Sequence, residues 1–306
     1  MKSNIKYILS ALLVFSSLIL LHISCKNSTE KKPKIAVTIL PQKYFAEKLT
    51  GNKFDVFCVV PTGSSPESYD PSPSLVMQLG NSDAYMKIGT LGFELAWMDK
   101  IKHNNPQLKV FDLSENVNEI EGGHICLHQD AHKDCDHDHS EHLEDLTTAD
   151  PHYWSSPKEM RVLLQNMYKA VVELDPQNEE YYKTNLDSLV TEVNQVDSQI
   201  TEILKNKTSD SFMIYHPALA YFARDYGLKQ LSIEEGGKEP TPNHLKSLID
   251  SARANNVSII FVQKEFDTNN AKVIAQETGA QIIEIDPLNY NWQQEMIRIA
   301  KAFARE

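Results

Sequence analysis

Short apolar runs alternate with longer amphipathic segments along residues 34–304, a pattern typical of an α/β protein. Strands are expected at 34–40, 53–60, 83–88 and 108–113, and again at 211–215, 228–233, 257–263 and 281–285. Helices are expected at 41–50, 73–80, 92–103, 217–226, 241–255, 269–278 and 291–304. Apolar strands that alternate with helices imply parallel sheets covered by helices on both faces. The pattern therefore predicts two α/β lobes.

A long helical segment separates the two halves. Its apolar positions recur at spacings of four and three residues, at Tyr182, Leu186, Leu189, Val193, Val196, Ile200 and Ile203. A helix over 178–205 would be ~40 Å long, enough to span two lobes. We predict a rigid linking helix, and the alternative is a coiled-coil seam between two copies. The predicted organisation is an N-terminal lobe (34–175), a linking helix (176–206) and a C-terminal lobe (207–306).

The N-terminus has the features of an export signal. Lys2 and Lys6 precede an apolar run at 8–21, which is shorter than the ~20 apolar residues of a comfortable membrane span. The sequence L-H-I-S-C that follows resembles a bacterial lipoprotein signal, with Cys25 as the lipidated residue. We expect a signal peptide at 1–24, a polar tether at 25–33, and a protein body lipid-anchored in the cell envelope, outside the cytoplasmic membrane.

The chain is acidic, with a formal net charge of −12. Negative charge disfavours binding to nucleic acid and to anionic lipid surfaces, and it is compatible with cations as ligands. We therefore expect no nucleic-acid partner and membrane contact only through the lipid anchor.

Residues 122–142 are rich in potential metal ligands. Six of the chain's eleven histidines lie there: His124, His128, His132, His137, His139 and His142. Their irregular spacing fits neither one helix face nor a zinc finger, so we predict a loop that captures several metal ions. Cys126 and Cys135 lie in the same loop, and they could form a disulfide or bind metal.

Four further candidates follow predicted strands. Glu67 follows strand 53–60, and His152 follows strand 108–113 and the histidine-rich loop. His216 and Asp286 come directly after strands 211–215 and 281–285. Ligands of open α/β sheets bind beyond the carboxyl ends of the strands. The four side chains are therefore expected to meet in a cleft between the lobes.

These positions lie in motifs that resemble the metal-binding receptors of bacterial ABC importers for zinc or manganese, a family of solute-binding lipoproteins. The motifs are P-T-G-S-S-P-E-S-Y, D-P-H-Y-W-S-S-P, Y-H-P-A-L-A-Y-F-A-R-D-Y-G-L, E-G-G-K-E-P-T-P and I-D-P-L. The resemblance implies two α/β lobes joined by one long helix, one metal ion in the cleft, and a membrane permease as partner. It also implies Glu67, His152, His216 and Asp286 as the ligands. We expect a monomer.

The chain departs from this family at Glu67, where the family usually has histidine. A carboxylate can bind zinc, but two histidines with two carboxylates also suit manganese or iron. The histidine-rich loop favours Zn²⁺ as the ligand, and Mn²⁺ or Fe²⁺ is the alternative.

Two other classes of protein are alternatives. A zinc-dependent hydrolase would need an open coordination position and a general base, and the chain contains no H-E-x-x-H or G-x-S-x-G motif. A surface protein for metal storage or adhesion is the second alternative. We favour a receptor that is not an enzyme.

Overall fold

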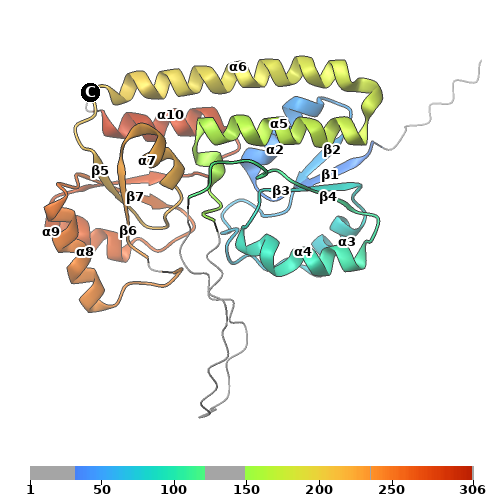
Figure 1. Cartoon of the computed structure of the whole chain (residues 1–306). Coiled ribbons are helices and arrows are strands. Elements are labelled where there is room, and N and C mark those ends of the chain that lie inside the picture. Colours follow the sequence, from blue (N-terminus) through green and yellow to red (C-terminus); the bar gives the residue numbers. More distant parts are fainter. Residues whose placement is uncertain (1–31, 121–148, 235, 305–306) are drawn as a thin grey trace, which may run out of the picture. The chain divides into compact units, whose positions relative to one another are not determined.

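Each half of the chain forms a four-stranded parallel sheet, as the hydrophobic pattern predicts (Figure 1). The computed structural model describes residues 32–120, 149–234 and 236–304. The first sheet has the order β2-β1-β3-β4 and contains β1 (Lys34–Val37), β2 (Asp55–Cys58), β3 (Ala84–Lys87) and β4 (Lys109–Asp112). The second has the order β6-β5-β7-β8 and contains β5 (Ser211–Ile214), β6 (Lys229–Ser232), β7 (Ile259–Gln263) and β8 (Gln281–Ile285). The predicted α/β fold class is confirmed.

Helices follow the strands close to the predicted bounds. They are α2 (Leu40–Thr50), α3 (Pro73–Gly80), α4 (Gly92–Asn104), α5 (Pro157–Leu174), α6 (Glu179–Leu204), α7 (Ala220–Tyr226), α8 (Pro242–Ala254), α9 (Asn269–Thr278) and α10 (Trp292–Phe303). Short 3-10 turns lie at Tyr153–Ser155 and Pro176–Asn178. Within the described residues, no helix is both long and apolar enough to cross a membrane.

Three helices begin at a hydroxyl residue followed by proline. Ser72, Ser156 and Thr241 each accept a hydrogen bond from a backbone N–H of the first turn. Proline then occupies the first helical position, where its missing N–H costs no hydrogen bond. This local chemistry fixes where α3, α5 and α8 start, and α5 in turn fixes the chain direction just after His152.

Side chains of the strands alternate between two apolar layers. In β1, Ile35 and Val37 face the largest core cluster, whereas Ala36 faces a separate cluster beneath α3 and α4. Phe212 and Ile214 of β5 join the same largest cluster, so one hydrophobic core continues through both lobes. Accordingly, the chain from Pro33 onward forms one compact unit.

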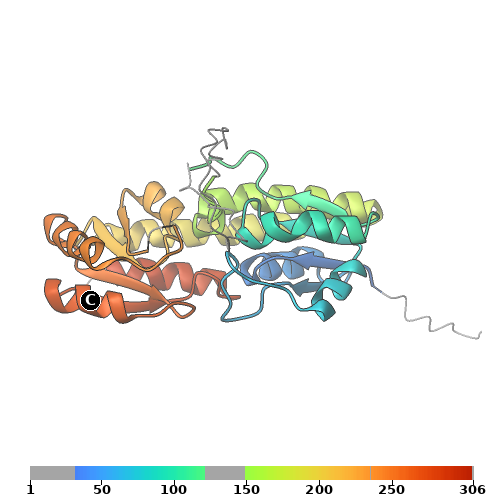
Figure 2. The ribbon, with the colours of Figure 1, turned by 90° about the horizontal axis from the view of Figure 1, so that it is seen from below.

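Helix α6 spans 26 residues and packs against α2, α5 and α10 (Figures 1 and 2). All the predicted seam positions except Ile203 are buried, and Leu204 takes the last place in the seam. The coiled-coil alternative is wrong, because this apolar face is covered by helices of the same chain. Helix α5, which the sequence analysis did not single out, supplies much of that cover.

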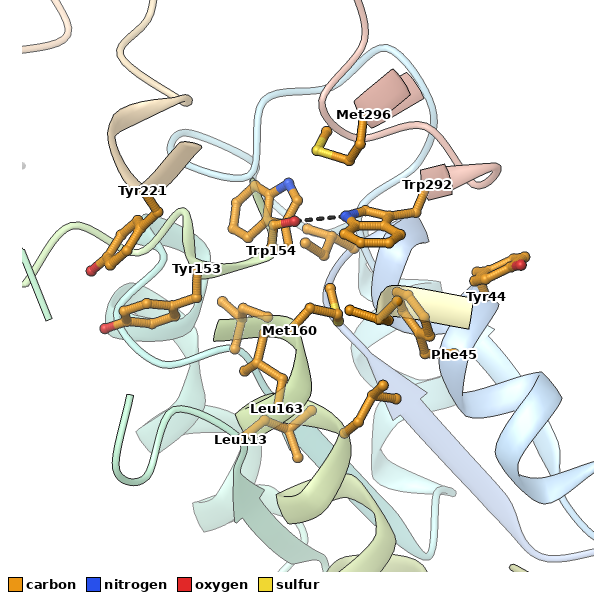
Figure 3. Close-up of a cluster of buried hydrophobic side chains, with 14 of the residues drawn as sticks. Tyr44, Phe45, Leu113, Tyr153, Trp154, Met160, Leu163, Tyr221, Trp292 and Met296 are labelled. Carbon is orange, nitrogen blue, oxygen red and sulfur yellow. Dashed lines mark hydrogen bonds between the residues drawn. The ribbon is translucent and has the colours of Figure 1, made fainter. Parts of the chain in front are cut away.

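Two tryptophans connect the lobes beside α6 (Figure 3). The indole N–H of Trp292 donates to the carbonyl of Trp154 at 2.6 Å, and that of Trp154 donates to the carbonyl of Pro287 at 2.9 Å. Trp292 also packs edge-on against Phe45 of α2, with ring centroids 5.3 Å apart. Both indoles are buried. The chain just after His152 is therefore fixed directly to the C-terminal lobe.

Candidate metal centre

Glu67, His152 and His216 come together from three distant parts of the sequence. One ligand atom from each residue lies within 4.8 Å of the others, and among the described residues this is the group that could hold a metal ion. The Nε2 atoms of His152 and His216 are 3.0 Å apart, and Glu67 Oε1 is 3.9 Å from His152 Nε2. Ligand atoms around a tetrahedral zinc ion are about 3.3 Å apart, given bond lengths near 2.0–2.1 Å. The three side chains therefore fit a divalent cation.

A carboxylate orients each imidazole. His152 Nδ1 lies 2.8 Å from Asp150 Oδ1, and His216 Nδ1 lies 2.6 Å from Glu234 Oε1. Because an ionised carboxylate only accepts, each Nδ1 carries the proton and each Nε2 turns its lone pair toward the centre. Neither Asp150 nor Glu234 is among the residues predicted from the sequence. Asp150 stands two residues before His152 in the same motif, and Glu234 follows β6, the neighbour of the strand that ends before His216.

The charges around His152 change its protonation. Burial lowers the pKa of His152, but the carboxylates of Asp150, Glu67 and Glu234 outweigh burial and raise that pKa above its ordinary value. Burial raises the pKa of Asp150, and the interaction with His152 more than reverses this and lowers it. The site therefore attracts positive charge, whether a proton or a metal ion.

The first turn of α4 positions Glu67. Its Oε2 accepts a hydrogen bond of 3.0 Å from the backbone N–H of Gly92, whereas Oε1 is buried without a hydrogen-bond partner among the described residues. A Cβ at Gly92 would lie 2.1 Å from the Glu67 carbonyl oxygen, so glycine is required for this approach. A helix N-terminus also favours a carboxylate electrostatically. One oxygen is therefore fixed and the other is available as a ligand.

A second carboxyl, that of Glu94, holds the segment before α4. It accepts hydrogen bonds from the backbone N–H groups of Ile88 and Gly89, at 2.8 and 2.9 Å. Complete burial raises the pKa of Glu94 to about 7. Glu94 thus fixes the segment before α4, and this segment places the Gly92 N–H next to Glu67.

Asp286, the fourth predicted ligand, lies outside the group of three. Its Oδ2 is 2.6 Å from Lys264 Nζ, and its Oδ1 is buried without a hydrogen-bond partner among the described residues. Its role as a ligand stays a prediction. The six loop histidines, Cys126, Cys135 and Cys25 lie outside the described residues.

The site opens into a pocket built from both lobes. Ser65 and Pro66 line one side, and Trp154 lies beside His152. Gln263, Glu265 and Phe266 line the C-terminal side. Gln263 and Phe266 also contact His216, and the sequence analysis missed both residues. Nothing in the hydrophobic pattern distinguishes them from other strand-end residues.

Comparison with known proteins agrees with this geometry. A metal-binding protein of Chlamydia trachomatis is 26% identical over 95% of this chain and 99% of its own length. The high-affinity zinc uptake system protein ZnuA of Bacillus subtilis is 27% identical over 89% of this chain and 86% of its own. A crystal structure of ZnuA shares 34% identity and a TM-score of 0.77, over 89% of this chain and 97% of that one. The family model for zinc-uptake complex component A, periplasmic, matches residues 35–305, and the chain therefore belongs to the ZnuA family.

Proposed function

We propose that this protein is the zinc-binding receptor of an ABC importer, which captures Zn²⁺ outside the cytoplasmic membrane and delivers it to a permease. The observation that carries this proposal is the group of Glu67, His152 and His216, whose ligand atoms lie within 4.8 Å of one another. Membership of a family of zinc-uptake components supports a receptor rather than an enzyme. The family description also supports a periplasmic location, and Cys25 would supply a lipid anchor there.

The metal is best tested by direct competition. Zn²⁺ and Mn²⁺ should be titrated against the purified protein in the presence of a chelator of known affinity. We expect Zn²⁺ to bind more tightly, because intrinsic affinities rise from manganese to zinc and because two imidazoles suit zinc. If Mn²⁺ bound more tightly than Zn²⁺, the protein would be a manganese receptor instead. Absence of tight binding by either ion would refute the receptor proposal.

Affinity for Zn²⁺ is expected to fall as the pH falls. Nearby carboxylates raise the pKa of His152, so this imidazole takes up a proton at a higher pH than an ordinary histidine does. Proton and metal compete for Nε2, and binding weakens as the pH drops through the range of that raised pKa. Chelator competition at a series of pH values measures the effect. A constant affinity from pH 8 to pH 5 would contradict histidine ligation.

The histidine-rich loop is proposed to collect Zn²⁺ at modest affinity and pass it to this site. The described residues on either side of it are joined, since Asp150 N donates to the Ile120 carbonyl at 2.9 Å. Tyr221 fixes the same point, because its hydroxyl accepts from Ile120 N and donates to the Asp150 carbonyl, at 3.0 and 2.8 Å. The loop therefore leaves and re-enters the fold at one place, two residues from His152.

Replacing residues 122–142 by a short Gly-Ser linker should leave the melting temperature and the tight site nearly unchanged. The length of a loop changes the free energy of folding little, since doubling it costs only ~0.6 kcal/mol. Total bound zinc, measured by elemental analysis at saturation, should fall. If the shortened protein lost the tight site or unfolded, the loop would be needed for the site or for the fold, and this proposal would be wrong.

A further inference from the structure

The hydroxyl of Tyr221, in α7, takes the place of a backbone hydrogen bond. Two facing residues of an antiparallel pair usually exchange two N–H···O bonds. Ile120 and Asp150 make one such bond directly, from Asp150 N to the Ile120 carbonyl at 2.9 Å. In place of the second, Ile120 N donates to the Tyr221 hydroxyl at 3.0 Å, and this hydroxyl donates to the Asp150 carbonyl at 2.8 Å. One side-chain oxygen therefore connects the two backbones.

The surroundings of Tyr221 fix this hydroxyl. The side chain is 0% exposed, and its ring packs against that of Tyr153 with centroids 5.2 Å apart (Figure 3). The Arg224 guanidinium lies over the Tyr221 ring, 4.9 Å from its centroid. Burial raises the pKa of Tyr221, so the hydroxyl keeps its proton and can donate. Its position and its hydrogen-bonding direction are both determined.

Tyr221 is tied to His216 through a short, braced turn. The turn between β5 and α7 contains a hydrogen bond of 2.7 Å from Ala218 N to the His216 carbonyl. At the start of α7, Leu219 N donates to Gln230 Oε1 of the neighbouring strand β6 at 2.9 Å. The Tyr221 hydroxyl and the His216 backbone are therefore parts of one held segment of the C-terminal lobe.

Asp150, on the other side of the hydroxyl, is tied to His152. Its Oδ1 accepts from His152 N at 2.8 Å and lies 2.8 Å from His152 Nδ1. Tyr221 therefore connects the segment of one imidazole with that of the other, and the two Nε2 atoms are 3.0 Å apart. The indole of Trp154 attaches the chain after His152 to the C-terminal lobe, and Tyr221 attaches the chain before it.

We propose that Tyr221 is a positioning residue of the metal centre, whose hydroxyl sets the approach of His152 to His216 by holding the Asp150 carbonyl. This inference rests on the proposed function. Without the hydroxyl, Ile120 N and the Asp150 carbonyl lose a hydrogen-bond partner, and an unpaired polar group shielded from water is costly. The two groups should then close on each other, which moves Asp150 and the imidazole that it orients.

The test compares Tyr221→Phe with Tyr182→Phe in the full mature chain. Each substitution removes a single hydroxyl from a tyrosine that is 0% exposed. The Tyr182 hydroxyl donates to Asp175 Oδ2 at 2.6 Å, at the start of α6 and outside the metal centre. Both variants should have a lower melting temperature without metal, because each loses hydrogen bonding inside the protein. Tyr182→Phe is therefore a control for destabilisation alone.

Only Tyr221→Phe should change metal binding. We expect its Zn²⁺ affinity, measured by chelator competition, to fall about 10-fold, the lower end of the range for outer-shell groups, because Tyr221 acts through Asp150. The visible absorption of bound Co²⁺, which reports the geometry of the ligands, should change as well. Tyr182→Phe should keep both the affinity and the spectrum of the unsubstituted protein.

A second measurement needs no substitution and stays decisive if Tyr221→Phe folds poorly. Coupling between Zn²⁺ binding and the Tyr221 contact must be mutual, so bound Zn²⁺ should stabilise the contact by the same factor. The amide hydrogen of Ile120, which donates to the hydroxyl, should therefore exchange about 10-fold more slowly with Zn²⁺ bound. The amide of Asn255, at the end of α8, should exchange equally fast in both forms.

Three results would overturn the proposal: unchanged affinity in Tyr221→Phe, equal losses of affinity in Tyr221→Phe and Tyr182→Phe, or exchange of the Ile120 amide that does not respond to Zn²⁺. In each case the unsubstituted protein still binds Zn²⁺ tightly, and the receptor function stands. Absence of tight Zn²⁺ binding by the unsubstituted protein would refute the receptor function itself, which is a different result.

Discussion

Replacing His216 by alanine is expected to abolish tight Zn²⁺ binding. The substitution removes one Nε2 ligand, 3.0 Å from that of His152, and it leaves the Glu234 carboxylate buried without its partner. The loss of affinity should exceed the ~10–100-fold typical of a substituted outer-shell group, because a direct ligand is lost. Chelator competition isolates this site from weaker binding elsewhere in the chain.

Two further variants make the result specific. His103→Ala changes an exposed histidine in the last turn of α4 and should leave the affinity unchanged. Glu234→Gln retains His216 but weakens the hydrogen bond that orients its imidazole. We expect an intermediate loss of Zn²⁺ affinity, about 10–100-fold. If His216→Ala bound Zn²⁺ as tightly as the unsubstituted protein, the assignment of this centre would be wrong.

The largest effect on stability is expected from Trp292→Ala. This side chain is 1% exposed, packs against Phe45, and donates to the carbonyl of Trp154 from the other lobe (Figure 3). Truncation of a buried tryptophan leaves a cavity and costs about 3–5 kcal/mol. For a chain of this size, that corresponds to a fall of roughly 10 °C in melting temperature.

Thermal unfolding followed by circular dichroism measures this effect. Trp292→Phe keeps an aromatic ring in place and removes the hydrogen bond, so it should be destabilised by less, about 1–3 kcal/mol for the unpaired Trp154 carbonyl together with lost packing. Equal melting temperatures for Trp292→Ala and the unsubstituted protein would show that this contact between the lobes contributes little.

Much of the fold follows from the sequence because its signals are local. The strand 281–285 was predicted at the bounds that the structure shows, and α6 differs from its predicted range by one residue at each end. The helix has a sustained helical period over 26 residues, and the strand is a short, mostly apolar segment that ends just before Asp286. Helix α5 was not singled out, although it has a serine cap and a proline at its first position. Helix α5 packs against α6 in the same hydrophobic core, and this contact between two helices depends on the tertiary structure.

The site was predictable only in part. The rule that ligands gather beyond strand ends places Glu67, His152 and His216 together, as the structure does. Asp286 also follows a strand of the second sheet, but it lies outside this group of three, and its role as a ligand stays a prediction. The structure pairs Asp286 Oδ2 with Lys264 Nζ at 2.6 Å, and a single sequence carries no signal for such a side-chain contact.

The shared core has a consequence for how long a bound ion stays. Since one cluster of buried side chains and helix α6 run through both lobes, separating the lobes would expose core surface and cost much of the free energy of unfolding. We therefore expect a bound ion to leave through movement of short segments at the pocket and not through separation of the lobes. A membrane partner that displaces one such segment could speed release greatly while the receptor remains folded and ready for another cycle.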